Sequence, residues 1–135
     1  MGKNYVDIED DQGDTLRYRK HANGRGLVAH GAKVSPAALI EAGAYIEPGA
    51  RVGAGAHIAR GAWIEPDAVI GENAWIDAHA HIGQGAAVGD GAHIGVRTDI
   101  GAGARIARGA RIGDDETVAA GMRIATDRKG LWLAA

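Results

Sequence analysis

From Val28 to Ile124, an aliphatic β-branched residue recurs at every sixth position of this chain without a slip or an insertion. From Ala32 to Ala110, Ala stands four places after each of these residues, with Thr98 as the one exception. Such a fixed short period predicts a repeat architecture in which each repeat adds one inward residue to a continuous core. The seventeen aliphatic positions are Val28, Val34, Ile40, Ile46, Val52, Ile58, Ile64, Ile70, Ile76, Ile82, Val88, Ile94, Ile100, Ile106, Ile112, Val118 and Ile124.

The residue before each Ala marks the corner of a repeat. It is Gly in most repeats and Asp or Asn in others, and these residues tolerate a positive φ angle. All three prolines, Pro36, Pro48 and Pro66, stand one place earlier, where a fixed φ suits a tight turn. Each hexad therefore predicts a short strand with its aliphatic residue pointing inward, followed by a corner that encloses the small Ala.

Over residues 28–127 these hexads resemble those of the hexapeptide-repeat superfamily, also called the transferase hexapeptide superfamily. The resemblance implies an all-β fold, a left-handed parallel β-helix in which three hexads complete each triangular coil. At 18 residues a coil, we expect about six coils.

The segments on either side of the repeats are expected to cover its ends, because a solenoid leaves unpaired strand edges there. Residues 5–19 alternate in polarity around a "DDQGD" turn, which predicts a β-hairpin. We therefore divide the chain into an N-terminal cap at 1–27, the β-helix at 28–127 and a C-terminal cap at 128–135. The "LWL" of residues 131–133 is expected to fold under the last coil.

Residues 18 apart stack vertically in such a coil, so the residue before each aliphatic position forms an outward column on each face. Trp63 and Trp75 then lie on the surface of two faces that share a corner, and exposed Trp is typical of interfaces. Superfamily members pack prism faces around a threefold axis, so the resemblance implies a homotrimer that buries the second and third faces. The columns are Lys33, Arg51, Val69, Ala87, Arg105 and Arg123 (first face); Leu39, His57, Trp75, His93 and Arg111 (second); and Tyr45, Trp63, His81, Asp99 and Thr117 (third).

The corner between the second and third faces carries the candidate site. Two of its corner positions, which favour a positive φ angle, are occupied by His79 and Arg97, and these residues lack the conformational freedom of glycine. Thr98, one place after Arg97, interrupts the series of Ala residues. Local rules tend to fail at functional or strained sites. Stacking predicts a polar quartet below Trp63, with His79 over Arg97 and His81 over Asp99. Tyr45, His57, Trp75 and His93 are expected to line the interface or the groove between subunits.

Three functions remain open for this corner. In the acyltransferases of the superfamily a histidine between subunits is the general base, and His81 oriented by Asp99 would fill that role, with acetyl-CoA or another acyl-CoA as donor. The γ-carbonic anhydrases of the superfamily hold zinc with three histidines, but their paired-histidine signature is absent here and we assign no metal site. The same His81–Asp99 pair could also be an interface hydrogen bond without catalysis.

The acyltransferases usually interrupt their coils with a loop that walls the active-site cleft, and the uninterrupted hexads of this chain provide none. We therefore interpret the chain as a homotrimeric structural or interaction module, a rigid scaffold that needs no cofactor and presents its faces to itself or to another protein. The alternative is a small acyl-CoA-dependent acyltransferase.

Composition adds little to this picture. The chain has 135 residues with 22 Gly, no Phe and no Cys, which excludes disulfides and thiolate chemistry. A net charge of −2 favours neither nucleic acid nor an anionic membrane as a partner. No apolar run has the length of a membrane span, so a cytoplasmic location is expected.

Overall fold

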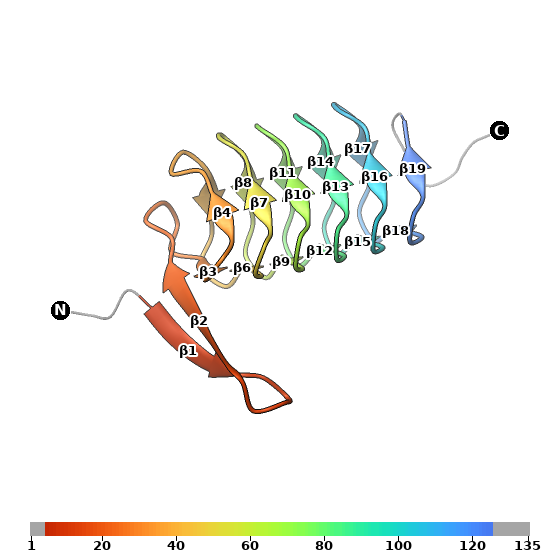
Figure 1. Cartoon of the computed structure of the whole chain (residues 1–135). Coiled ribbons are helices and arrows are strands. Elements are labelled where there is room, and N and C mark those ends of the chain that lie inside the picture. The colour runs from red at the N-terminus through yellow and green to blue at the C-terminus, as the bar shows by residue number, and fades with distance from the viewer. Residues whose placement is uncertain (1–4, 126–135) are drawn as a thin grey trace.

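The computed structural model describes residues 5–125, and every regular element in this range is a strand. No helix in the described part of the chain is long and apolar enough to cross a membrane. Two longer strands, β1 (Tyr5–Glu9) and β2 (Thr15–Lys20), precede a solenoid of short ones (Figure 1). These are β3 (Leu27–Ala29), β4 (Lys33–Val34), β5 (Leu39–Ile40), β6 (Tyr45–Ile46), β7 (Arg51–Val52), β8 (His57–Ile58), β9 (Trp63–Ile64), β10 (Val69–Ile70), β11 (Trp75–Ile76), β12 (His81–Ile82), β13 (Ala87–Val88), β14 (His93–Ile94), β15 (Asp99–Ile100), β16 (Arg105–Ile106), β17 (Arg111–Ile112), β18 (Thr117–Val118) and β19 (Arg123–Ile124).

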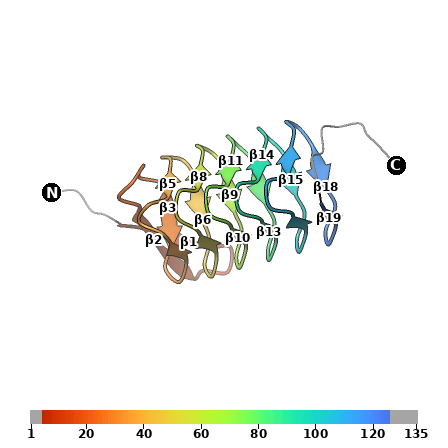
Figure 2. The same cartoon turned by 90° about the horizontal axis from the view of Figure 1, so that it is seen from above.

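The solenoid strands pair in parallel with the strand three places further along the chain, which builds three sheets. The first face is β4, β7, β10, β13, β16 and β19; the second is β5, β8, β11, β14 and β17; the third is β3, β6, β9, β12, β15 and β18. Viewed from above, the coils follow one another in a row (Figure 2). The register joins residues 18 apart, such as His81 with Asp99, so the predicted parallel β-helix and its outward columns are confirmed.

The number of coils is smaller than expected. Five complete coils, from β3–β5 to β15–β17, are followed by β18 and β19 alone within the described residues. The sequence estimate of about six counted hexads up to residue 127, whereas the last of them completes no third strand in the range described. The predicted C-terminal cap, including "LWL", lies outside the described residues.

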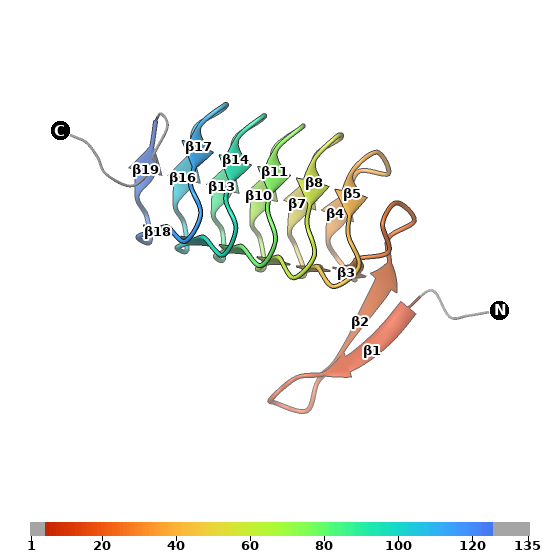
Figure 3. The ribbon, with the colours of Figure 1, turned by 180° about the vertical axis from the view of Figure 1, so that it is seen from behind.

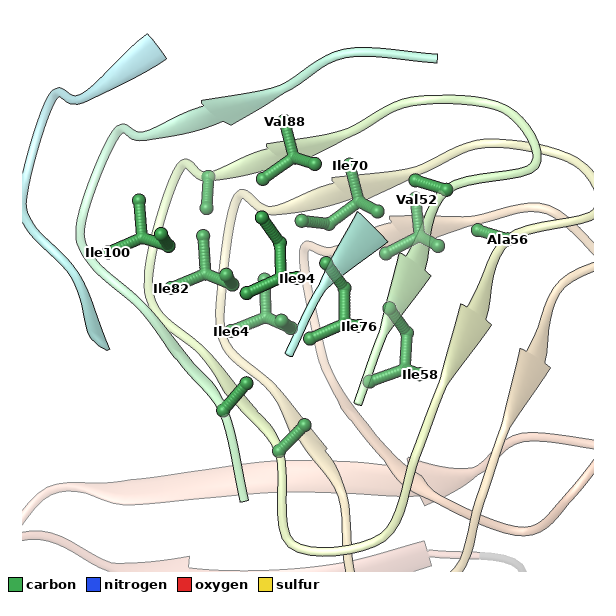
Figure 4. Close-up of a cluster of buried hydrophobic side chains, with 14 of the residues drawn as sticks. Val52, Ala56, Ile58, Ile64, Ile70, Ile76, Ile82, Val88, Ile94 and Ile100 are labelled. Atoms are coloured by element: carbon green, nitrogen blue, oxygen red, sulfur yellow. The ribbon is translucent and has the colours of Figure 1, made fainter. Parts of the chain in front are cut away.

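The core is a stack of the predicted aliphatic residues. Ile58, Ile76 and Ile94 succeed one another on the inside of the second face, and residues from the other two faces meet them at the centre of the prism (Figure 4). Ile40, Ile46, Ile58, Ile64, Ile70, Ile76, Ile82, Ile94 and Ile100 are all at most 1% exposed. Burial of each such side chain contributes about 1.5–3 kcal/mol to stability, so each coil adds a nearly equal share to the stability of the core.

The corners adopt the left-handed conformation that the sequence predicts. Gly residues at these corners have φ values between 67° and 94°. Asp67, Asn73, His79, Arg97 and Asp115 occupy the same position with φ between 57° and 64°. Where Ala follows the corner, from Ala38 to Ala110, it is buried inside the turn, as predicted, because only a small side chain fits between the corner and the core.

The N-terminal hairpin extends the third face. β1 pairs antiparallel with β2, and β2 pairs antiparallel with β3, so β2 covers the edge of that sheet. The link at 21–26 covers the edge of the second face instead, because Gly26 N–H donates to Ile40 O at 2.8 Å and Ile40 N–H donates to Asn23 O at 3.0 Å. Seen from both sides, the hairpin leaves the first coil at an angle (Figures 1 and 3).

Candidate active site

His81 lies at the centre of a polar cluster on the third face. Its Nδ1 is 2.9 Å from Asp99 Oδ1, one coil further along. Its Nε2 is hydrogen-bonded to Glu65 Oε2, one coil before. The indole of Trp63 stacks on the imidazole, with ring centroids 5.0 Å apart and planes 29° apart. Both ring nitrogens therefore have carboxylate partners, and the ring is clamped against an aromatic side chain.

The strand geometry explains this cluster. Trp63, His81 and Asp99 occupy the same outward position of β9, β12 and β15, one above another. Glu65 stands two residues after Trp63, beyond the inward Ile64, so it also points outward. From there its side chain reaches diagonally to the next coil. Sequence analysis predicted the contact with Asp99 and missed Glu65.

The same diagonal contact recurs on the second face. His57 Nε2 is 2.6 Å from Glu41 Oε2, and His93 Nε2 is 3.4 Å from Asp77 Oδ2. In each pair, as in His81 and Glu65, the carboxylate lies 16 residues before the histidine. An acidic residue 16 places before a histidine is the sequence signal that would have found these pairs. The bond from His57 holds the pKa of Glu41 below its ordinary value.

Aromatic side chains connect the histidines of the second face. Trp75 lies between His57, with ring centroids 4.1 Å apart, and His93, with centroids 6.1 Å apart. Trp63 and Trp75 are 47% and 44% exposed, on two faces that share a corner. The structure therefore places both tryptophans on the surface where the sequence predicted them.

Tyr45 begins the aromatic column of the third face. It is exposed and makes an edge-on contact with Tyr18 of the hairpin, with ring centroids 5.9 Å apart. Tyr18 is buried and its hydroxyl donates to Glu47 at 2.6 Å, while the indole N–H of Trp63 donates to the other oxygen of Glu47 at 2.7 Å. Burial is the main cause that raises the pKa of Tyr18. Glu47 thus connects the hairpin to the aromatic column of the third face through two hydrogen bonds.

His79 and Arg97 lie one coil apart at the same corner, as the stacking predicts, but their side chains have other contacts. His79 is exposed, and its ring lies over Gly61 of the coil before, where a Cβ would overlap the imidazole. Arg97 instead makes a bidentate ion pair with Asp115, at 2.7 and 3.0 Å. This hydrogen bonding lowers the pKa of Asp115 and raises that of Arg97. Within the predicted quartet, the hydrogen bond that the structure shows between side chains is that of His81 with Asp99.

Thr98 is a structural residue, in contrast to its interpretation as a mark of the functional corner. It is fully buried, and its hydroxyl donates to Gly113 O at 2.6 Å and accepts from Glu116 N–H at 3.1 Å. In a regular corner the corresponding amide and carbonyl bond directly, as Ala80 N–H does to Asp77 O. The Thr98 hydroxyl bridges these groups at the corner where Glu116 replaces the expected Ala.

Within residues 5–125, no group of three or more His, Cys, Asp or Glu side chains is arranged to hold a metal ion. The histidines His57, His81 and His93 each use a ring nitrogen on a carboxylate. The site therefore presents the imidazole of His81, which a hydrogen bond at Nδ1 orients, beside the exposed indole of Trp63.

Known proteins give this geometry a context. A family model of bacterial transferase hexapeptide repeats matches residues 67–98. Perosamine N-acetyltransferase from Caulobacter crescentus, solved with CoA and GDP-perosamine, is similar at 31% identity with a TM-score of 0.70 over 74% of this chain and 49% of that chain. The acetyltransferase domain of PglB from Neisseria gonorrhoeae, solved with acetyl coenzyme A, is 29% identical, with a TM-score of 0.55 over 75% of this chain and 49% of that one. No curated protein sequence matches the chain.

These similarities correct the functional expectation. The chain spans about half the length of the acetyltransferases that it matches. Those proteins are enzymes that bind CoA or acetyl-CoA, so the interpretation as a purely structural module is wrong, and the expectation of no cofactor is not supported. The absence of a loop between hexads is therefore insufficient to exclude catalysis. With a matching repeat model, the same solenoid and these structural neighbours, the chain belongs to the hexapeptide-repeat superfamily of left-handed β-helix proteins.

Proposed function

We propose that this chain is the β-helix of an acyl-CoA-dependent acyltransferase in which His81 is the general base. The observation that carries the proposal is the 2.9 Å hydrogen bond between His81 Nδ1 and Asp99. Once Glu65 gives up Nε2 to an acceptor, the Asp99 carboxylate at Nδ1 favours the tautomer whose Nε2 is able to take a proton. His57 and His93 bind their carboxylates through Nε2 and lack this arrangement among the contacts described.

The reaction would join an acceptor hydroxyl or amine to the acyl group of the donor thioester. The acceptor heteroatom attacks the thioester carbonyl carbon, the new C–O or C–N bond forms, and the C–S bond breaks. His81 Nε2 removes the acceptor proton and returns it to the departing CoA sulfur. In the free chain Glu65 bonds to this nitrogen, so its carboxylate occupies the place that the acceptor heteroatom takes.

A homotrimer is part of the proposal, because His81 lies on an open sheet face of the single chain. The exposed Trp63 and Trp75 support it, since they mark the two faces next to one corner. Packing of the third face of one copy against the second face of another would enclose His81 and exclude water from it. Light scattering coupled to size-exclusion chromatography should report three copies, and Trp63→Ser with Trp75→Ser should reduce the number.

The catalytic role is tested with acetyl-CoA as donor and GDP-perosamine as the first acceptor, because that pair of ligand types is seen in the similar C. crescentus enzyme. A thiol reagent measures the CoA released. We expect His81→Asn to lower kcat by roughly 10²–10⁴, the usual contribution of a general base. Asp99→Asn should lower it less, and His30→Asn, which changes an exposed histidine outside the proposed site, is the matched control. Equal turnover by wild type and His81→Asn would refute the assignment of His81.

Binding and catalysis are separated in the same experiment. Isothermal titration with acetyl-CoA should give similar affinities for wild type and His81→Asn, because Asn is smaller than His, adds no bulk at the site and keeps a hydrogen-bonding group near the position of Nδ1. A chain that binds acetyl-CoA but transfers no acyl group to any amine or alcohol offered would leave the acceptor to be found. A chain with no affinity for acetyl-CoA would contradict the proposal.

A further inference from the structure

The first face of the prism differs in charge from the other two. Its outward residues on either side of the inward positions are basic, apolar or small, and none of them in the described part of the chain is a carboxylate. Glu47, Glu65 and Asp99 are outward on the third face, and Glu41 and Asp77 on the second. The outward residues of the first face are Lys33, Ser35, Arg51, Gly53, Val69, Gly71, Ala87, Gly89, Arg105, Ala107, Arg123 and Ala125.

The register forces cations of the first face together. Lys33 stands directly opposite Arg51 on the neighbouring strands β4 and β7, at the strand spacing of about 4.8 Å. Like charges directly opposite each other destabilise a sheet. Neither side chain makes an ion pair with any residue of the described range, whereas Arg17 and Arg97 do. The folded chain therefore holds two positive charges side by side.

These cations border a hollow in the surface. Arg19 of the hairpin, Lys33 and Arg51 line it, so two separate parts of the fold contribute cations. Its remaining lining is Ala32, Val34, Ser35, Val52, Gly53, Val69, Ile70, Gly71, Glu72 and Asp90. Of the two carboxylates at the rim, Asp90 accepts a hydrogen bond from the Glu72 amide at 2.8 Å.

The backbone keeps this hollow free of side chains. A Cβ on Gly71 would lie 2.5 Å from the backbone nitrogen of Asp90, and one on Gly53 would lie 2.9 Å from that of Glu72. Real Cβ atoms do not approach so closely, so these positions require glycine for reasons of chain packing. The depression beside Arg51 is consequently a fixed feature of the coil.

We propose that this hollow on the first face binds a phosphate group, held by Arg19, Lys33 and Arg51. Phosphate oxygens accept several charge-assisted hydrogen bonds at once, and Arg and Lys are the side chains that supply them. A dianion between Lys33 and Arg51 replaces their mutual repulsion by two attractions. The site lies on the face that carries neither Trp63 nor Trp75, so it stays accessible when those two faces associate.

Thermal unfolding with inorganic pyrophosphate as the probe tests the site, with sodium chloride added to keep the ionic strength constant. The Tm of the wild type should rise with pyrophosphate and reach a plateau. Arg51→Gln should raise the Tm of the ligand-free chain, because it removes the repulsion between Lys33 and Arg51. It should also raise the pyrophosphate concentration at half-saturation more than tenfold. Arg108→Gln removes one exposed positive charge at a corner outside the hollow and is the matched control.

The phosphate could belong to a free solute or to a lipid headgroup, and a second arm separates these sources. Sedimentation with phosphatidylglycerol vesicles that is lost in Arg51→Gln and absent with phosphatidylcholine assigns a lipid headgroup. A pyrophosphate response without sedimentation assigns a soluble phosphate ester. A wild type that responds to neither probe, or an Arg51→Gln variant that responds as the wild type does, overturns the proposal.

Discussion

Replacing Thr98 with Ala restores the residue that the repeat favours, yet we expect this change to destabilise the chain. The Thr98 hydroxyl is buried and makes two hydrogen bonds, to Gly113 O and from Glu116 N–H. Each such bond contributes about 0.5–1.5 kcal/mol net. In Thr98→Ala the two backbone groups are free to move toward each other and bond directly, which returns part of the loss. The expected net cost is about 1–2 kcal/mol.

Thr98→Val should cost more than Thr98→Ala. Its second methyl group fills the space of the hydroxyl, so the freed amide and carbonyl are held apart without partners, at about 2–3 kcal/mol. Urea unfolding followed by Trp fluorescence and by circular dichroism measures both variants. Thr117→Val is the control, because Thr117 is exposed on the third face and its change should stay within about 0.5 kcal/mol. A Thr98→Ala chain as stable as the wild type would refute the bridging role of the hydroxyl.

Three further changes test other parts of the fold. Tyr18→Phe removes the partly buried hydrogen bond to Glu47 and should lower the free energy of unfolding in urea by about 1.5–3 kcal/mol. Glu41→Gln tests the pKa of Glu41, which His57 holds low. A carboxyl group whose pKa is lower in the folded than in the unfolded chain stabilises the fold above the unfolded pKa, and this contribution is lost as the pH falls through the folded pKa. The excess Tm of wild type over Glu41→Gln should therefore be largest near neutral pH and vanish in acid. Ile82→Ala opens a cavity in the fully buried stack and should cost about 2–5 kcal/mol by the same urea titration, unless the neighbouring coils close on it.

The hexad pattern, together with the family that it resembles, was sufficient to predict the fold. The period places every aliphatic residue inside, and the resemblance implies three hexads a coil, so the 18-residue register followed, and with it the contact of His81 with Asp99. The exposed positions of Trp63 and Trp75 followed from the same arithmetic. Periodicity determines on which face a residue lies, and it determines this without any knowledge of side-chain conformation.

The remaining contacts depend on side-chain reach, which the period does not contain. Glu65 reaches His81 from the coil before, and Arg97 turns toward Asp115 because a carboxylate is a better partner for a guanidinium than an imidazole. Thr98 departed from the repeat for a structural reason, so a broken rule did not mark function at that position. The functional expectation failed because it rested on a missing loop, and absence of one feature says little about chemistry.

The unbroken period also governs which changes of length the chain could survive. Removal of 18 residues, such as 101–118, would shorten the prism by one coil and leave every later residue on its own face. Removal of six, such as 83–88, would keep an aliphatic residue at every inward position and yet turn all later residues by one face. Asp99 would then move from the third face to the second, away from His81. An insertion or deletion of any multiple of six residues therefore preserves the inward aliphatic residues of the core. Only a multiple of 18 residues, placed outside the segment from His81 to Asp99, also preserves the site.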